Sequence, residues 1–195
     1  MAQPKPIQGV DLSRLVEIRW HSRAGQGAVT AAETLASAAL REGRHVQAFP
    51  EFGPERMGAP LRAFNRIGPR PVRIHGVVEQ ADVVIVVDPS LVGAVPVDQN
   101  VAPSGIILVN TTQSVADLRR RLTLDGQTVA CVDATTIAVE CFRLQKPNTP
   151  MLGAVARATA LISLDSLLAQ VEETFSKKFS SAIVEGNLHA VRRAY

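Results

Sequence analysis

The chain has 195 residues, which is enough for one domain with a substantial hydrophobic core, and no internal repeat or linker marks a second domain. Aromatic residues make up 4% of the chain, so alanine, valine, leucine and isoleucine must fill that core. The formal net charge of +3 gives little support for nucleic-acid binding, because Phe64 is the only aromatic residue among the arginines of positions 62–73.

No run of the sequence approaches the roughly 18 apolar residues of a membrane span, and the first residues contain no apolar leader segment. The sequence therefore predicts a cytoplasmic protein that binds neither a membrane nor nucleic acid. Residues 1–14 are polar and contain prolines, which predicts an N-terminal arm, and residues 15–195 are expected to form a single domain.

The first half of the chain predicts a strand, a helix and two further strands. Residues 15–20 alternate apolar and polar side chains as a strand does, and apolar residues recur at three- and four-residue steps from Val29 to Leu40, as on the buried face of a helix. Gly43 then predicts the end of that helix. Residues 45–49 and 61–67 have the pattern of two strands separated by a proline-rich loop.

Three apolar runs in the second half predict the central strands of a sheet. The runs cover residues 82–88, 106–110 and 129–133, and each ends in a polar residue. Helical patterns are expected at about 113–122, 134–143, 150–162, 164–175 and 177–193. This alternation predicts an α/β fold with an open, mostly parallel, doubly wound-like sheet that is flanked by helices and followed by a helical C-terminal tail.

The two cysteines, Cys131 and Cys141, lack the C-x-x-C spacing that would suit zinc or an iron–sulfur cluster. We therefore expect no metal site and no cluster in this chain alone. Both cysteines are predicted to be reduced core residues of a cytosolic protein.

A glycine-rich turn separates the first strand from the first helix, a place where such turns hold phosphates in other proteins. The turn contains His21, Gly25, Gln26 and Gly27, but Thr30 stands where the dinucleotide pattern G-x-G-x-x-G needs a third small residue. Two interpretations remain: a partial nucleotide site, or close helix–strand packing through the two glycines, which the residues favour. His21 has side-chain chemistry suited to acid–base catalysis, yet it has no partner in the sequence pattern and is equally a hydrogen-bonding cap.

The segment Pro50–Pro60 is a rigid, irregular loop, because its prolines fix φ and its glycines permit positive φ. It mixes apolar side chains that are unfavourable in water with charged ones that are unfavourable when buried unpaired. We expect another molecule to cover it, and an ordinary strand connection is the alternative. The glutamates are expected to pair with Arg56 or to accept backbone N–H bonds. The candidate contact residues are Pro50, Glu51, Phe52, Gly53, Pro54, Glu55, Arg56, Gly58 and Pro60.

Polar residues also follow the three predicted central strands. They are Asp88, Asn110 and the pair Asp133 and Thr135. Ligands and partners gather at the carboxyl edge of doubly wound sheets, so these residues are candidates for a site. Each of them could equally cap the helix that follows.

These motifs, taken in order, resemble the gamma subunit of the 2-oxoacid:ferredoxin oxidoreductases, the pyruvate/ketoisovalerate family. The resemblance covers about residues 15–190, and one departure is Ala24, where the family commonly carries a glycine. The motifs are His21-x-x-x-Gly25-Gln26-Gly27, Pro50-Glu51-Phe52-Gly53-Pro54-Glu55-Arg56-x-Gly58-Ala59-Pro60, Asp88-Pro89, Val109-Asn110, Asp133-Ala134-Thr135 and Asn148-x-x-Met151-Leu152-Gly153.

The resemblance implies a complex that oxidatively decarboxylates a 2-oxoacid with coenzyme A to acyl-CoA and carbon dioxide. Thiamine diphosphate, Mg²⁺ and [4Fe-4S] clusters would belong to alpha, beta and delta-type subunits, and ferredoxin or another acceptor would take the electrons. The resemblance implies that this chain holds no cofactor, braces the other subunits and shapes the access of coenzyme A. The loop at residues 50–60, with Arg56 at its centre, would then be buried against another subunit or line the approach of coenzyme A. The 2-oxoacid stays open among pyruvate, branched-chain, 2-oxoglutarate and aryl-glyoxylate types. The alternatives are a stand-alone nucleotide-dependent oxidoreductase and a purely structural interaction domain.

Overall fold

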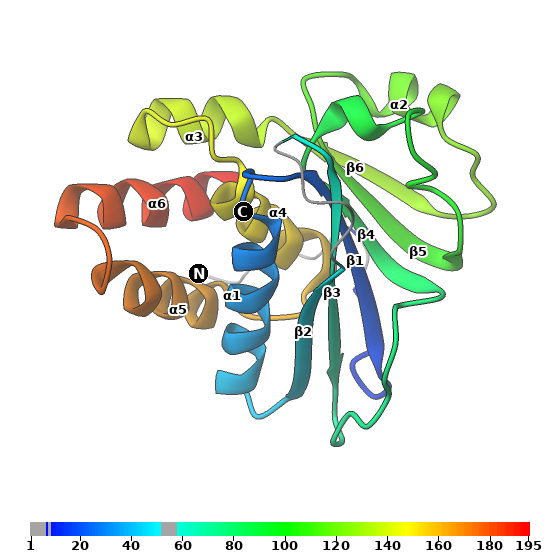
Figure 1. Cartoon of the computed structure of the whole chain (residues 1–195), viewed down its shortest axis with the longest axis horizontal. Helices are drawn as coiled ribbons and strands as arrows, with labels where there is room; N and C mark the ends of the chain where they lie inside the picture. Colours follow the sequence, from blue (N-terminus) through cyan, green and yellow to red (C-terminus); the bar gives the residue numbers. More distant parts are fainter. Residues whose placement is uncertain (1–6, 8, 52–57) are drawn as a thin grey trace.

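Six strands form one mixed sheet in the computed structural model, which describes residues 7, 9–51 and 58–195. The order across the sheet is β2-β3-β1-β4-β5-β6 (Figure 1). Only β3 runs against the other described strands, since it pairs antiparallel with both β1 and β2 while β1, β4, β5 and β6 pair in parallel. The strands are β1 (Val16–Arg23), β2 (His45–Glu51), β3 (Pro60–Gly68), β4 (Ala81–Val86), β5 (Val101–Asn110) and β6 (Thr128–Val132).

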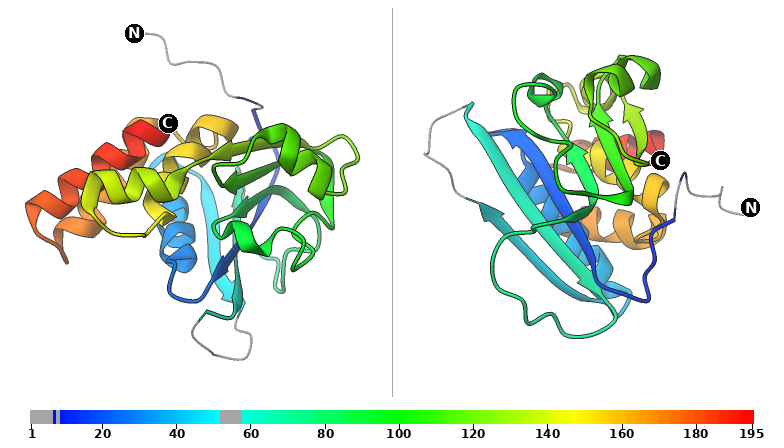
Figure 2. Two further views of the ribbon diagram at one scale, coloured as in Figure 1. Left: turned by 90° about the horizontal axis from the view of Figure 1, so that it is seen from above. Right: turned by 90° about the vertical axis from the view of Figure 1, so that its right-hand side faces the viewer.

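Most of the helices pack on one face of this sheet, and the opposite face is covered by α2 and by long connections (Figures 1 and 2). The predicted flanking helices and helical C-terminal tail are confirmed, within a few residues of their expected ends. The first group is α1 (Ala28–Arg41), α3 (Ala134–Phe142), α4 (Asn148–Thr159), α5 (Leu164–Ser176) and α6 (Ser181–Ala194). The opposite face has α2 (Val115–Arg121) and the short 3-10 turn η1 (Pro89–Leu91).

Strand alternation divides the core into two clusters. Val16, Ile18 and Trp20 of β1 point toward α1 and join the larger cluster, which Met151 of α4 also enters. The smaller cluster lies on the other face and is built around β4, β5 and the connections that follow them. The intervening residues of β1 are polar, so the half of the sheet formed by β1, β2 and β3 presents charged side chains on the face away from α1.

Glycines set the close approach of the helices to one another. A Cβ atom on Gly153 of α4 would lie 2.3 Å from the carbonyl oxygen of Val191 in α6. A Cβ atom on Gly186 of α6 would lie 2.7 Å from the carbonyl oxygen of Cys141 in α3. The C-terminal helices therefore pack backbone against backbone, as expected of a chain with small core residues.

Two expectations about buried residues were wrong. Leu40 is 60% exposed, because the buried residues of α1 end at Ala39 and Leu40 lies at its exposed C-terminal end beside Arg41. Cys131 and Cys141 are free thiols, as expected, but both are only partly buried. No helix in the described part of the chain has the length and apolar character needed to cross a membrane.

Candidate functional site

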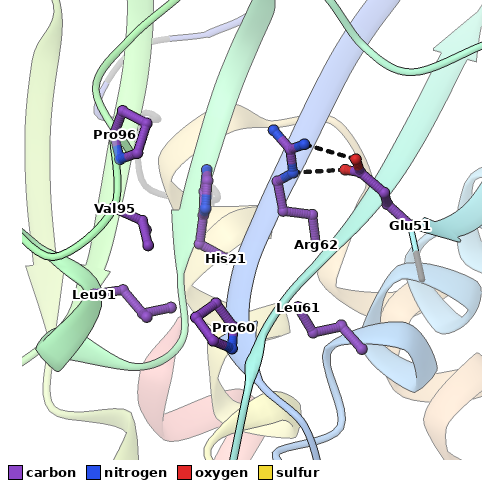
Figure 3. Close-up of a pocket in the computed structure, with 8 residues that line it drawn as sticks. All are labelled: His21, Glu51, Pro60, Leu61, Arg62, Leu91, Val95 and Pro96. Carbon is purple, nitrogen blue, oxygen red and sulfur yellow. Dashed lines mark hydrogen bonds and ion pairs between the residues drawn. The ribbon is translucent and has the colours of Figure 1, made fainter. Parts of the chain in front are cut away.

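A cavity of about 360 Å³ opens where β1 and β2 end and β3 begins, on the sheet face away from α1 (Figure 3). One wall comes from the three strands, and the other from η1 and the segment after it. The lining residues are His21, Glu51, Pro60, Leu61, Arg62, Leu91, Val95 and Pro96.

Strand register places three polar side chains in a row at this cavity. Arg62 of β3 is the register partner of His21 in β1 on one side and of Glu51 in β2 on the other. Directly opposed residues of neighbouring strands project from the same face, so Arg62 lies between the other two side chains, as Figure 3 shows. The register therefore brings two sequence-predicted residues, His21 and Glu51, together with an arginine that no motif had indicated.

Glu51 holds Arg62 through both carboxylate oxygens. The Arg62 Nε lies 2.6 Å from Oε2, and the Arg62 Nη2 donates to Oε1 at 2.7 Å. Sequence reasoning did not indicate this partner of Glu51, which the antiparallel register of β2 and β3 places directly opposite. The predicted pairing with Arg56 falls on residues outside the described part of the chain and stays a prediction. The pairing predicted for Glu55 stays a prediction, because residues 52–57 lie outside the described residues. These include Phe52, Gly53, Pro54, Glu55 and Arg56.

His21 is buried and neutral. It is 4% exposed, and its Nε2 has no hydrogen-bond partner within the described part of the chain. Burial lowers the pKa of His21 to about 3, and the positive charges of Arg19 and Arg62 act in the same direction. At neutral pH the imidazole is therefore uncharged and cannot act as a general acid. The structure therefore disfavours the acid–base interpretation of this histidine.

Of the other described residues of the predicted loop, only Pro60 lines the cavity. Pro50 lies within β2 opposite Ala63, and Pro60 is the exposed first residue of β3. Gly58 has a φ of +79°, and its carbonyl oxygen accepts a hydrogen bond of 3.0 Å from Arg23 Nη1. The last residue of β1 thus fixes the position at which the chain re-enters the sheet.

The glycine-rich turn is tied to the neighbouring strand end. The Gln26 side chain donates to Asp88 Oδ2 at 2.6 Å and accepts from the Arg23 backbone N–H at 2.8 Å. Arg23 in turn lies 3.5 Å from the same carboxylate oxygen and donates to Ser90. Burial raises the pKa of Asp88, but hydrogen bonds from Ser90 and Gln26 and the charge of Arg23 outweigh it, so the pKa is lowered and the carboxylate stays ionised.

The two glycines of the turn do not pack a helix against a strand as expected. Gly27 has a φ of +82°, and a Cβ atom there would lie 2.7 Å from Nδ2 of Asn148, the first residue of α4. Gly25 faces open space, while its carbonyl oxygen accepts a hydrogen bond of 2.6 Å from Lys146 Nζ. The glycine turn and the late Asn148 motif, which are distant in the sequence, are therefore in contact.

The polar residues at the other strand ends hold the fold together. The Asn110 amide donates to the carbonyl oxygen of Val87 at 2.8 Å and to Thr135 Oγ1 at 2.9 Å, and it accepts from the Thr135 N–H at 3.2 Å. Asp133 caps α3, and Asp88 caps η1. Met151 is fully buried. None of these side chains lines the cavity around His21.

Sequence reasoning missed most of the cavity wall. Arg62 could have been found by applying the two-residue period of β3, which places it on one face with Phe64 and Arg66. Leu91, Val95 and Pro96 lie in or after η1, where no periodic pattern indicates the direction of a side chain.

The donor atoms of this chain do not fit the metal groups that the resemblance implies for the complex. A [4Fe-4S] cluster takes four cysteine ligands, and the sequence has two cysteines. Within residues 7, 9–51 and 58–195, no group of three His, Cys, Asp or Glu side chains could hold a metal ion. No reaction step is therefore assigned here to a metal or a cluster.

The fold and the cavity define an α/β domain whose cavity residues include one neutral imidazole and one fixed ion pair, without a serine or cysteine nucleophile among the described lining. The family model described as pyruvate ferredoxin/flavodoxin oxidoreductase matches residues 17–195. The chain belongs to this family, as a gamma-type subunit of its 2-oxoacid oxidoreductase complexes.

Individual relatives agree with this assignment. The chain is 48% identical over 181 residues to the pyruvate/ketoisovalerate oxidoreductases common subunit gamma of Pyrococcus furiosus, covering 93% of this chain and 96% of that one. It resembles the crystal structure of pyruvate oxidoreductase subunit PORC from Thermotoga maritima with a TM-score of 0.82 and 43% identity, over 93% and 96% of the two chains. The same fold occurs in a 2-oxoglutarate:ferredoxin oxidoreductase from Magnetococcus marinus, with a TM-score of 0.76 and 18% identity, over 93% of this chain and 30% of that one.

Proposed function

We propose that this chain braces the thiamine- and cluster-bearing subunits of a 2-oxoacid oxidoreductase and shapes the access of coenzyme A. The complex would convert a 2-oxoacid and coenzyme A to acyl-CoA and carbon dioxide, and pass the electrons through [4Fe-4S] clusters to ferredoxin or another acceptor. Thiamine diphosphate, Mg²⁺ and the clusters would reside in alpha, beta and delta-type subunits. The two cysteines of this chain, too few for a cluster, support that division of labour.

The single observation that carries the coenzyme A proposal is the cavity beside His21. Its walls are mainly apolar, its lining includes the neutral imidazole of His21, whose buried Nε2 has no hydrogen-bond partner among the described residues, and the partly exposed Arg62 guanidinium stands next to it. Coenzyme A combines apolar and heteroaromatic parts with phosphates, and arginine binds phosphates with charge-assisted hydrogen bonds. The Magnetococcus marinus relative was solved with 2-oxoglutarate, coenzyme A and succinyl-CoA bound.

The kinetic test compares coenzyme A with the 2-oxoacid in the purified complex. Arg62→Ala and Arg56→Ala should each raise the KM for coenzyme A roughly tenfold, the expected effect of losing one charge-assisted contact, and leave the KM for the oxoacid unchanged. Arg120→Ala is the matched control, because Arg120 is exposed on α2. Equal changes in both KM values would contradict the coenzyme A role, and dissociation of the complex would assign these arginines to assembly.

Native mass measurement tests the bracing role. A gamma subunit should purify with larger chains of the complex, whereas a stand-alone oxidoreductase should be active by itself.

We also propose a cytoplasmic location without membrane or nucleic-acid partners, which the two free thiols support because reduced cysteines are typical of that compartment.

A further inference from the structure

A second cavity lies in the helical layer, on the other side of the sheet from His21. It has a volume of about 360 Å³ and is formed where α1 and α4 begin, where α3 ends, and where α5 gives way to α6. We call it the helix-layer groove and define it by Phe142, Leu144, Lys146, Phe175, Lys178 and Phe179.

The groove exposes large apolar side chains from two separate connections. Leu144 follows α3 and is 51% exposed, and Phe179 follows α5 and is 48% exposed. Phe179 packs edge-on against Phe175, with ring centroids 5.5 Å apart. The aromatic side chain is therefore held in place at the groove, and burying it against a partner would require little additional ordering.

The electrostatic character of the groove is positive. Its described lining contains Lys146 and Lys178 and no Asp or Glu. The helices α1 and α4 both begin at the groove, and neither has a side-chain cap, so their N-terminal partial positive charges add to those of the lysines. The Lys146 ammonium group donates one hydrogen bond to the Gly25 carbonyl oxygen, and this bond holds the charge at the rim of the groove. An ammonium group has three donors, so it can also bind a carboxylate.

We propose that the helix-layer groove docks a segment of one of the larger subunits, in which an apolar side chain stands next to carboxylates. This inference rests on the proposed place of the chain in a complex. The apolar residue would fill the space between Leu144 and Phe179, and the carboxylates would meet Lys146 and Lys178. A segment of this composition matches the groove in both charge and polarity, and it would join two connections that are distant in the sequence.

The first experiment isolates the complex through a tag on this chain. The wild-type chain should recover the larger subunits, and failure at this point would overturn the proposed function rather than the groove. The variant Leu144→Asp/Phe179→Asp should recover at least tenfold less of them. Because both side chains are about half exposed and Phe179 packs against Phe175, the isolated variant should stay folded and lose about 2–4 °C of Tm, the shift expected for about 1 kcal/mol. Leu40→Asp is the matched control, since Leu40 is an exposed leucine near the far end of α1, and it should leave recovery unchanged.

The second experiment identifies the occupant. Zero-length carboxylate–amine cross-linking of the intact complex should join Lys146 or Lys178 to Asp or Glu residues of a larger subunit. Lys178→Glu should reduce recovery severalfold because it reverses the charge, and Lys178→Arg should preserve recovery because it keeps the positive charge. Full recovery with the double variant, an equal loss with Leu40→Asp, or cross-links confined to two copies of this chain would each overturn the proposal.

Discussion

The cavity beside His21 and the contacts between the C-terminal helices use family motif residues in opposite ways. At the cavity, the side chains of His21 and Glu51 both form part of the lining, and Glu51 makes an ion pair with Arg62. In the helical layer, Gly153 and Gly27 leave out a side chain so that another element can approach within contact distance. A motif residue in the first region contributes a polar side chain, whereas one in the second lacks a side chain and so allows close packing.

This difference separates two outcomes of mutation. A substitution in the helical layer should change the free energy of unfolding, because close-packed backbone cannot move aside for an added atom. A substitution at the cavity should mainly change binding or the response to pH. The glycine turn joins both regions, since it follows His21 and ends at the Gly27 contact with Asn148.

The largest effect is expected for Gly153→Ala. The added Cβ would lie 2.3 Å from the Val191 carbonyl oxygen, so α4 and α6 would have to separate, and we expect the free energy of unfolding to fall by about 3 kcal/mol in urea denaturation. In a helix free of that contact, alanine would instead stabilise by about 1 kcal/mol through its helix propensity. Gly186→Ala, with its closest contact at 2.7 Å, should lose less. A stabilised Gly153→Ala protein would show that the close helix packing is wrong.

A smaller loss is expected for Asn110→Ala. The change removes the amide that connects Val87 with Thr135 and leaves the buried Val87 carbonyl oxygen and the partly buried Thr135 N–H without that partner. We expect the free energy of unfolding to fall by about 2 kcal/mol, measured by urea denaturation. Asp133→Ala removes only the cap of α3 and should lose about 1 kcal/mol. If the two variants lost equal stability, Asn110 would be no more than a capping residue.

The fold was predictable because its signals are local and strong. The runs at 82–88, 106–110 and 129–133 overlap the strands β4, β5 and β6, although β5 begins five residues before its run, and five of the predicted helices match α2 to α6. What local periodicity could not give was the direction of β3. In the sheet, β3 lies between β2 and β1. This order depends on the edge of β1 along which the chain pairs after Pro60, and no short-range signal in the sequence indicates that edge.

The cavity was only partly predictable for the same reason. His21 was recognised from its motif, and Glu51 from the proline-rich loop, but their common neighbour Arg62 depends on long-range register. The depressed pKa of His21 likewise results from burial in the folded chain and from the charges of Arg19 and Arg62. Motif reading identified the chemical groups, and tertiary structure determined their protonation and partners.

The response to pH tests whether His21 belongs to the cavity as a buried neutral group. Its pKa falls from 6.5 to about 3 on folding, so the unfolded chain binds more protons below pH 6.5 and acid favours unfolding. The stabilisation is complete above pH 6.5 and is lost toward pH 3, with a slope of up to about 1.4 kcal/mol per pH unit. Between pH 7 and pH 5 the wild-type chain should therefore lose about 2 kcal/mol that His21→Gln does not lose.

Urea denaturation at the two pH values gives the comparison directly, and it depends on the difference in slope rather than on the absolute stability of the variant. His45→Gln is the control, because His45 is exposed at the start of β2 and its removal should leave the wild-type pH response intact. A His21→Gln protein with the wild-type response would mean that the imidazole is solvated or paired in the folded chain. The cavity would then lose the unpaired nitrogen that distinguishes it from the close-packed helical layer.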